Sequence, residues 1–179
     1  MVPCKDECFL LLERYEVPDH VIEHSRRVHA VALYLCRMLN GHGERLDEAK
    51  VQAGSLLHDI AKMKTMGTGG NHAREGARMV WELGFPEVAE IVRQHVVLDV
   101  GPDHGRITEA EVVHYADKRV KHTTIVPLVE RFEDLKKRYG KGSEALAWLE
   151  DLERQSLSLE ERIFQKISIL PEALAEIRE

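Results

Sequence analysis

The sequence predicts an all-α fold, a helical bundle with additional helices at its C-terminal end. Only 6% of its residues are aromatic, and strong helix formers such as Leu, Ala, Glu, Lys and Arg dominate the composition. Apolar residues recur with the helical period, whereas runs of β-branched residues stay short. The length of 179 residues suits one domain over 1–179, with a helical core at about 19–140 and a C-terminal helical extension at about 141–179.

The first half of the chain contains five amphipathic segments separated by Pro, Gly or capping residues. We expect Asp47 to cap the third helix and Asn71 to cap the fourth, because both side chains accept hydrogen bonds from free helix N–H groups. The stretches at 64–71 and 98–107 read as loops. The five expected helices span about 4–15, 19–39, 47–63, 72–83 and 87–97.

The second half begins with a capping box of Thr108 and Glu111, which predicts a helix over 108–121. Three further amphipathic segments follow Pro127, at about 127–139, 143–155 and 158–169. The last of these starts at another apparent capping box, formed by Ser158 and Glu161. These C-terminal segments contain no comparable cluster of metal-ligand residue types.

The overall charge and the cysteines limit the range of functions. The formal net charge of −6 argues against a sequence-independent grip on nucleic acid, which needs a clustered basic face. A small phosphorylated ligand is compatible with this negative net charge, because bound metal ions can make the local charge of a site positive. Cys4, Cys8 and Cys36 are odd in number and suit reduced thiols, so we expect a cytoplasmic protein. No apolar run approaches the roughly 18 residues of a membrane span, so we expect neither export nor a membrane anchor.

Histidine is frequent, with ten residues in the chain. A single histidine on a helix is ordinarily a surface or a satisfied core residue, but here four fall at inward-facing or terminal positions of separate helices. Asp117 shares an apolar helix face with Val113 and Val120, where an unpaired charge is costly unless a cation or hydrogen bonds compensate it. The candidate metal ligands are His24, His58, Asp59, His72, His95 and Asp117.

Mixed imidazole and carboxylate ligands suit iron, manganese, cobalt or zinc better than calcium, which prefers oxygen ligands alone. The adjacent His58 and Asp59 can converge on one ion where a helix end lets both side chains turn inward. Four ligands would complete the protein shell of one ion, and the remaining two histidines favour a second. We therefore expect two divalent transition-metal ions, with iron, manganese or cobalt favoured and zinc also compatible.

The order of these residues resembles the signature of the HD superfamily of metal-dependent phosphohydrolases over about 19–125. The motifs are His24, then His58 and Asp59 within LLHDIAK, then Asp117 within HYADK. The histidines in NHAREGA and RQH resemble the extra ligands of the two-metal branch. The resemblance implies that one ion is held by His24, His58, Asp59 and Asp117, and the second by His72 and His95. It also implies that Asp59 bridges the two ions and is essential for catalysis.

Several basic residues near these motifs are candidate phosphate contacts. Lys62 matches the HDxxK form of the motif, which implies a catalytic and substrate-binding role, although a solvated lysine at a helix end explains it equally well. Lys118, Arg119 and Lys121 follow Asp117 and could also contact phosphate, or form the solvated face of that helix.

Subfamily features narrow the resemblance. The chain after His95 lacks the second histidine and the GYP triplet of cyclic-di-GMP phosphodiesterases, and IAK differs from the motifs of guanosine tetraphosphate hydrolases and deoxynucleotide triphosphohydrolases. The greatest likeness is to bacterial symmetrical diadenosine tetraphosphate hydrolases, through HDxAK and the Tyr115-Ala116-Asp117-Lys118 segment. This implies hydrolysis of a phosphoester or phosphoanhydride of a nucleotide or dinucleotide by metal-activated hydroxide. The following RVKH and the long C-terminal extension differ from that family, which leaves the substrate open.

Two alternatives remain at this level. The same six-ligand pattern resembles a smaller HD branch of diiron oxygenases, and a non-catalytic nucleotide-binding regulatory module would also use such a fold. Oxygen uptake would distinguish the first, and ligand binding without turnover the second. The native metal, the natural substrate and the oligomeric state are open.

Overall fold

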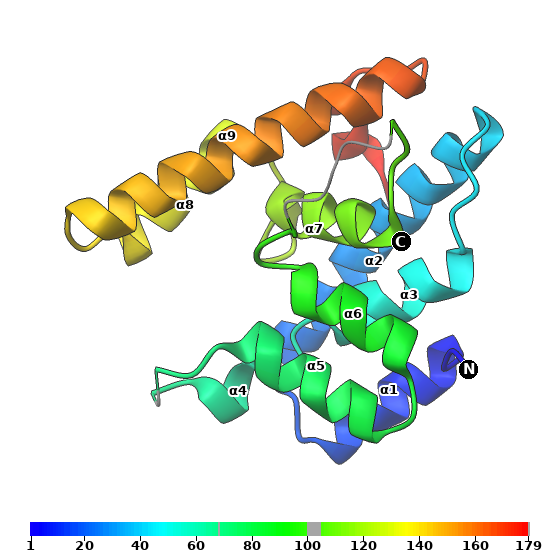
Figure 1. The fold of residues 1–179 in the computed structure, drawn as a ribbon, viewed down its shortest axis with the longest axis vertical. Coiled ribbons are helices and arrows are strands. Elements are labelled where there is room, and N and C mark those ends of the chain that lie inside the picture. The colour runs from blue at the N-terminus through cyan, green and yellow to red at the C-terminus, as the bar shows by residue number, and fades with distance from the viewer. Residues whose placement is uncertain (68, 100–104, 179) are drawn as a thin grey trace.

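The computed structural model describes residues 1–67, 69–99 and 105–178, and the regular secondary structure of this part is almost entirely helical (Figure 1). The prediction of an all-α fold is therefore confirmed. The helices are α1 (Lys5–Arg14), α2 (Asp19–Gly41), α3 (Glu48–Leu57), α4 (Lys62–Thr65), α5 (His72–Glu82), α6 (Pro86–Gln94), α7 (Glu109–Arg119), α8 (Leu128–Tyr139) and α9 (Ser143–Lys166), followed by the 3₁₀ helix η1 (Pro171–Glu176).

Three of the four predicted helix caps are confirmed. Asp47 accepts hydrogen bonds from the N–H groups of Ala49 and Lys50 at the start of α3, and Asn71 accepts one from Arg74 at the start of α5. The capping box of Thr108 and Glu111 is also present, and it begins α7. These caps satisfy free N–H groups and so determine where the helices begin.

Several predicted boundaries are wrong, among them the end of the helix expected over 87–97, which lies at Gln94. The third helix ends at Leu57 instead of 63, and the chain then turns into the short α4. The second capping box does not form, because Ser158 lies inside the continuous α9. The buried stripe of Leu152, Leu159 and Ile163 continues through this helix without a break, which explains why it does not divide there. Parts of the two predicted loops, at residues 68 and 100–104, lie outside the described residues.

Another wrong boundary is the end of the helix predicted over 108–121, which lies at Arg119. The chain leaves the helix after Arg119, and β1 (Val120–Lys121) pairs in antiparallel fashion with β2 (Thr124–Ile125). His122, at a φ of 56°, lies in the turn between the strands. Arg119 anchors the hairpin, because its Nε donates to the Val126 carbonyl over 2.7 Å.

The buried apolar residues form two clusters. One joins α2, α7, α8 and α9 around Leu35, Tyr115 and Phe132, and the other joins α1, α3, α5 and α6 around Leu12 and Val92. Figure 1 shows α7 near the centre of the molecule, with α9 crossing above it and α5 and α6 below it. The predicted ligands come from α2 and α7, from the start of α5, and from the residues that directly follow α3 and α6.

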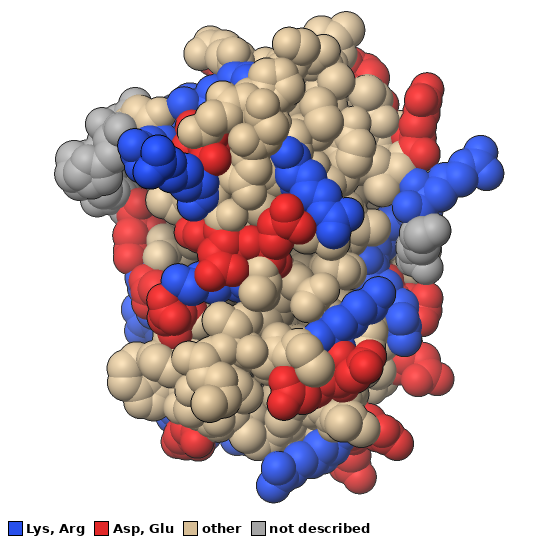
Figure 2. Space-filling model, turned by 90° about the vertical axis from the view of Figure 1, so that its right-hand side faces the viewer, with Lys and Arg blue, Asp and Glu red and all other residues tan. Residues whose placement is uncertain are grey.

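The surface carries charges of both signs. On the face shown in Figure 2, basic and acidic side chains alternate with uncharged areas, and this face shows no broad basic field. None of the helices in the described part of the chain is both long and apolar enough to span a membrane.

Candidate metal centre

His24 lies on the buried side of α2, in line with the apolar stripe that begins at Val21. Its Nδ1 is 2.7 Å from the carbonyl oxygen of His122 in the hairpin turn. A carbonyl only accepts, so His24 donates from Nδ1, and in the neutral ring Nε2 carries a lone pair. That Nε2 is 3.1 Å from Oδ1 of Asp117 on α7.

His58 and Asp59 occupy the turn between α3 and α4. Adjacent residues inside a helix diverge by about 100° around its axis, so the end of α3 at Leu57 allows both side chains to face the interior. Both are buried, at 0% and 2% exposure. His58 Nδ1 donates to the Ser55 carbonyl over 2.8 Å, which again leaves Nε2 facing the centre.

His72 and His95 come from helix ends on the opposite side of Asp59. The Asn71 cap makes His72 the first residue of α5. His95 follows the last residue of α6, and its Nδ1 donates to the Val92 carbonyl over 2.7 Å. The Nε2 atoms of the two rings are 3.1 Å apart, and they lie 3.5 Å and 3.7 Å from Asp59 Oδ1.

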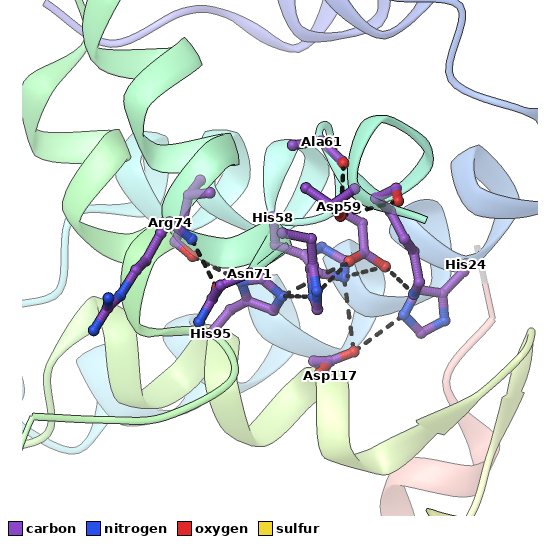
Figure 3. A network of polar contacts seen from close by, with 12 residues as sticks. His24, His58, Asp59, Ala61, Asn71, Arg74, His95 and Asp117 are labelled. Carbon is purple, nitrogen blue, oxygen red and sulfur yellow. Dashed lines mark hydrogen bonds and ion pairs between the residues drawn. The ribbon is translucent and has the colours of Figure 1, made fainter. Parts of the chain in front are cut away.

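The structure thus brings all six predicted residues together, as Figure 3 shows for most of them. Two groups have ligand atoms within 4.8 Å of one another, and Asp59 belongs to both. Asp117 adjoins the first group, 3.7 Å from His58 Nε2. The groups are His24, His58 and Asp59, and Asp59, His72 and His95.

The donor chemistry fits a cation. His58 Nε2 is buried and has no hydrogen-bond partner within the described chain, which is costly for a polar atom unless something else satisfies it. His24 Nε2 lies 3.1 Å from the Asp117 carboxylate, so this contact is favourable when a ring proton or a metal ion lies between the two atoms. Imidazole nitrogens and carboxylates directed at one point suit divalent transition metals.

The electrostatics favour the ionised form of both carboxylates and the neutral form of His95. At His58, by contrast, burial would lower the pKa, but Asp59 and Asp117 raise it. Burial alone would raise the pKa of Asp59, but His58 and Lys62 hold it well below its ordinary value. Burial likewise opposes ionisation of Asp117, and Lys118 with the nearby histidines holds its pKa well below the usual range. Burial lowers the pKa of His95 to about 3, so this ring is neutral at neutral pH. Metal binding requires ionised carboxylates and neutral imidazoles.

The predicted phosphate contacts lie in different surroundings. Lys62 is 45% exposed at its side chain and donates to Asp59 Oδ2 over 2.5 Å. Lys118 is buried, and its Nζ donates to Asp117 Oδ2 over 2.7 Å and to the His95 carbonyl over 3.0 Å. Lys121 pairs with Glu130 at the surface. Arg119, which is 3% exposed, is an internal anchor rather than a surface cation.

Sequence reasoning missed a cavity of about 270 Å³ next to the cluster. Arg131 and Arg138 enter it from α8, and the Nε of Arg131 is buried without a hydrogen-bond partner among the described residues. Both arginines also contact Asp134, at 3.5 Å and 3.1 Å. The sequence offers one signal for this cavity, since Arg131 and Arg138 are seven residues apart and therefore lie on one face of α8. The lining residues are His20, Val21, His24, Lys62, His122, Arg131, Leu135, Arg138 and Tyr139.

The helical fold and the histidine–aspartate cluster are typical of metal-dependent hydrolases. The family model of the HD domain matches residues 21–167, and the chain belongs to this family. HD-domain proteins bind divalent metals, and most are metal-dependent phosphohydrolases. The matched region contains the six clustered residues.

Three relatives add to this comparison. The uncharacterized protein MJ0778 of Methanocaldococcus jannaschii is 31% identical over 69% of this chain and 79% of its own length. Two proteins named tRNA (cytidine(56)-2'-O)-methyltransferase are also similar. The one from Picrophilus torridus is 26% identical over 75% of this chain and 39% of its own length. The one from Thermoplasma volcanium is 31% identical over 54% of this chain and 27% of its own length.

The chain therefore spans well under half the length of either methyltransferase. No solved structure gives a significant match to it.

Proposed function

We propose that this protein is a metal-dependent phosphohydrolase that cleaves a phosphoester or phosphoanhydride bond, with a nucleotide or dinucleotide as substrate. The observation that carries the proposal is a cavity rich in cations directly beside the histidine–aspartate cluster. His24 and Lys62 line it together with Arg131 and Arg138. On a chain of net charge −6, such a local excess of positive charge suits an anionic substrate.

In this proposal the six clustered residues hold two divalent ions. His24, His58 and Asp117 bind the first, His72 and His95 bind the second, and Asp59 bridges them. When bound, such ions supply Lewis acidity at phosphoryl oxygens and activate water for attack on phosphorus. Iron, manganese and cobalt suit this ligand set.

The chain's own residues orient the substrate. Lys62 is within hydrogen-bond distance of Asp59, and its half-exposed ammonium can turn from this carboxylate to a phosphate. The arginines of the cavity offer planar guanidinium groups, which bind phosphate oxygens in pairs. Tyr139 and Leu135 line the same cavity and provide an apolar contact for a base or sugar. This combination favours a nucleotide over inorganic phosphate.

Lys118 has a positioning role in this proposal, through its bonds to Asp117 and the His95 carbonyl. Direct contact of Lys118 or Lys121 with phosphate stays a prediction. The names of the two methyltransferases apply to proteins of which this chain covers less than half, so methyl transfer is not part of the proposal.

The test is a turnover assay with protein loaded with manganese, cobalt or iron(II), over a panel of nucleotides and dinucleotides. We expect phosphate release that chelation abolishes and metal restores, with no oxygen consumption. Metal-replete protein that is inert toward the panel and consumes oxygen with an organic substrate would favour the oxygenase. Binding of a nucleotide without turnover under every metal would favour the regulatory module.

A matched pair of variants tests the substrate contact. Lys62→Gln removes the cation beside Asp59, whereas Lys64→Gln removes a cation that pairs with Glu75 away from the cavity. Loss of one charge-assisted hydrogen bond predicts a fall in kcat/KM of about tenfold to a hundredfold for Lys62→Gln. Both variants should keep their metal content. Equal rates in the two variants would show that Lys62 does not contact the substrate and is a solvated lysine at a helix end.

A further inference from the structure

A second cavity, of about 460 Å³, lies between α1, α2 and the segment that follows η1. Its α2 residues follow the helical period from Arg26 to Met38, on roughly the opposite side of α2 from His24. It is therefore separate from the cavity beside the metal cluster. Its volume lies within the range of small-molecule sites. The apolar lining consists of Phe9, Ala30, Leu33, Tyr34, Met38 and Ile177.

A single buried polar group, His29, also lines this cavity, and it is 8% exposed. Its Nδ1 is 3.3 Å from Ser55 Oγ. The Ser55 hydroxyl donates to the Gln52 carbonyl over 2.9 Å, so its oxygen is free to accept and His29 donates from Nδ1. In the neutral ring Nε2 then carries a lone pair, for which no donor exists among the described residues.

The imidazole is neutral at physiological pH. Burial, together with the charges of Lys5 and Arg37, lowers the pKa of His29 to about 4. The Nε2 atom is therefore an acceptor, and it suits a ligand that brings an N–H or O–H group.

The rim of the cavity is basic. Lys5, Arg26, Arg37 and Arg178 line it, and the described lining contains no carboxylate. Arg26 stacks 4.0 Å from the Phe9 ring, and Arg37 pairs with Glu48 over 3.0 Å. The other two cations, Lys5 and Arg178, form no ion pair with another described residue, so they are available to an anion.

We propose that this cavity is a second binding site, specific for a small aromatic anion. The ring lies on the apolar lining, an N–H or O–H group of the ligand donates to His29 Nε2, and its negative charge meets Lys5 and Arg178. A neutral apolar ligand would leave the imidazole acceptor and the two cations without partners. A purely inorganic anion would leave the apolar lining exposed.

The probe for this proposal is anilinonaphthalene sulfonate, which combines an aromatic body, an N–H group and a sulfonate. We expect saturable binding of one probe molecule per chain, followed by fluorescence and by equilibrium dialysis. Arg178→Glu should weaken this binding at least tenfold, whereas Arg154→Glu, the same change of charge on α9, should leave it unchanged. Ala30→Phe should fill the cavity and abolish binding, while the thermal unfolding midpoint shows that the variant stays folded.

Lys62→Gln separates this site from the proposed active site, because probe binding should not depend on the residues beside the metal cluster. Saturable binding that Arg178→Glu and Ala30→Phe weaken and Lys62→Gln leaves intact supports the proposal, whatever the outcome of the turnover assay. Binding that only Lys62→Gln weakens, or no saturable binding to the folded protein, overturns it.

Discussion

The contact between α3 and α6 leads to a sharp prediction about stability, because a glycine permits it. Gly54 on α3 faces Ile91 on α6, and a Cβ atom at Gly54 would lie 2.5 Å from Ile91 Cγ2 and 3.2 Å from Ile91 Cβ. Optimal carbon–carbon separations begin at about 3.5 Å. The branched Ile91 side chain is stiff at χ1 in a helix, and its Cβ is itself too close. The two helices must therefore separate by about 1 Å in Gly54→Ala.

The magnitude follows from two opposing effects. Overpacking a buried contact costs about 1–3 kcal/mol, whereas replacing a helical glycine by alanine gains up to about 1 kcal/mol. Because two helix backbones must move, we expect a net loss of about 1–2 kcal/mol in the free energy of unfolding. For a chain of this length that corresponds to a fall in Tm of about 2–8 °C.

The control is Gly41→Ala at the end of α2, where a new Cβ has no neighbour within 4 Å. It removes another helical glycine without a clash, so it should be neutral or slightly stabilising. Urea unfolding of both variants isolates the cost of the contact. The reasoning is refuted if Gly54→Ala is as stable as Gly41→Ala.

A double-mutant cycle with Ile91→Ala tests the same contact. The truncation alone should cost about 2–5 kcal/mol, but it also removes the atoms that meet the new methyl group. The double variant should therefore be more stable than the sum of the single changes by about 1–3 kcal/mol. We also expect Gly54→Ala to retain metal less well, because α3 and α6 end beside the proposed ligands His58 and His95.

Three further predictions concern the centre and the pH dependence of stability. Asp59→Ala should lose both ions and all turnover, whereas His72→Ala should lose one ion; equal, full metal content in the two variants by elemental analysis would contradict the ligand assignment. Lys118→Met leaves Asp117 buried without its cation, and should cost about 3–5 kcal/mol in chelator-treated protein and less after metal loading, as urea unfolding would measure. Because the pKa of His29 is lowered to about 4 on folding, the unfolded chain binds more protons, so stability is lost as the pH falls from about 6.5 toward 4. His29→Gln should flatten this loss in urea midpoints measured at pH 7 and pH 5, and an unchanged slope would assign the acid sensitivity to other groups.

The ligand cluster could be predicted from sequence because it depends on local rules. Asn71 caps a helix with its own side chain, and this alone makes His72 the first residue of α5. Asp117 was conspicuous as a carboxylate among Ala110 and Val113 on one helix face. The convergence of His58 and Asp59 was predicted. The position of the helix end that permits it, at Leu57, was not.

The surroundings of the cluster depend on distant contacts, and these were missed. Lys118 is recognisable in the sequence as a cation next to the ligand Asp117. Its ammonium group is also satisfied by the His95 carbonyl, 23 positions earlier in the chain, and this contact could not be predicted. Arg119 is similar, since its guanidinium donates to the Tyr115 hydroxyl over 2.6 Å and to Glu160 over 3.1 Å. This buried network joins α7 to α9, so the C-terminal helix forms part of the support of the centre.

The hairpin after α7 shows why helical periodicity could not reveal this site completely. Its turn at His122 supplies a backbone carbonyl to His24 Nδ1, and it thereby selects the tautomer that directs Nε2 toward the centre. A carbonyl is present on every residue, so no side-chain motif marks this contact. The same turn brings the His122 ring within 2.9 Å of Arg138 on α8. The turn of a two-residue hairpin thus contacts both a candidate ligand and the cationic cavity beside it, and a shift of this turn would affect both together.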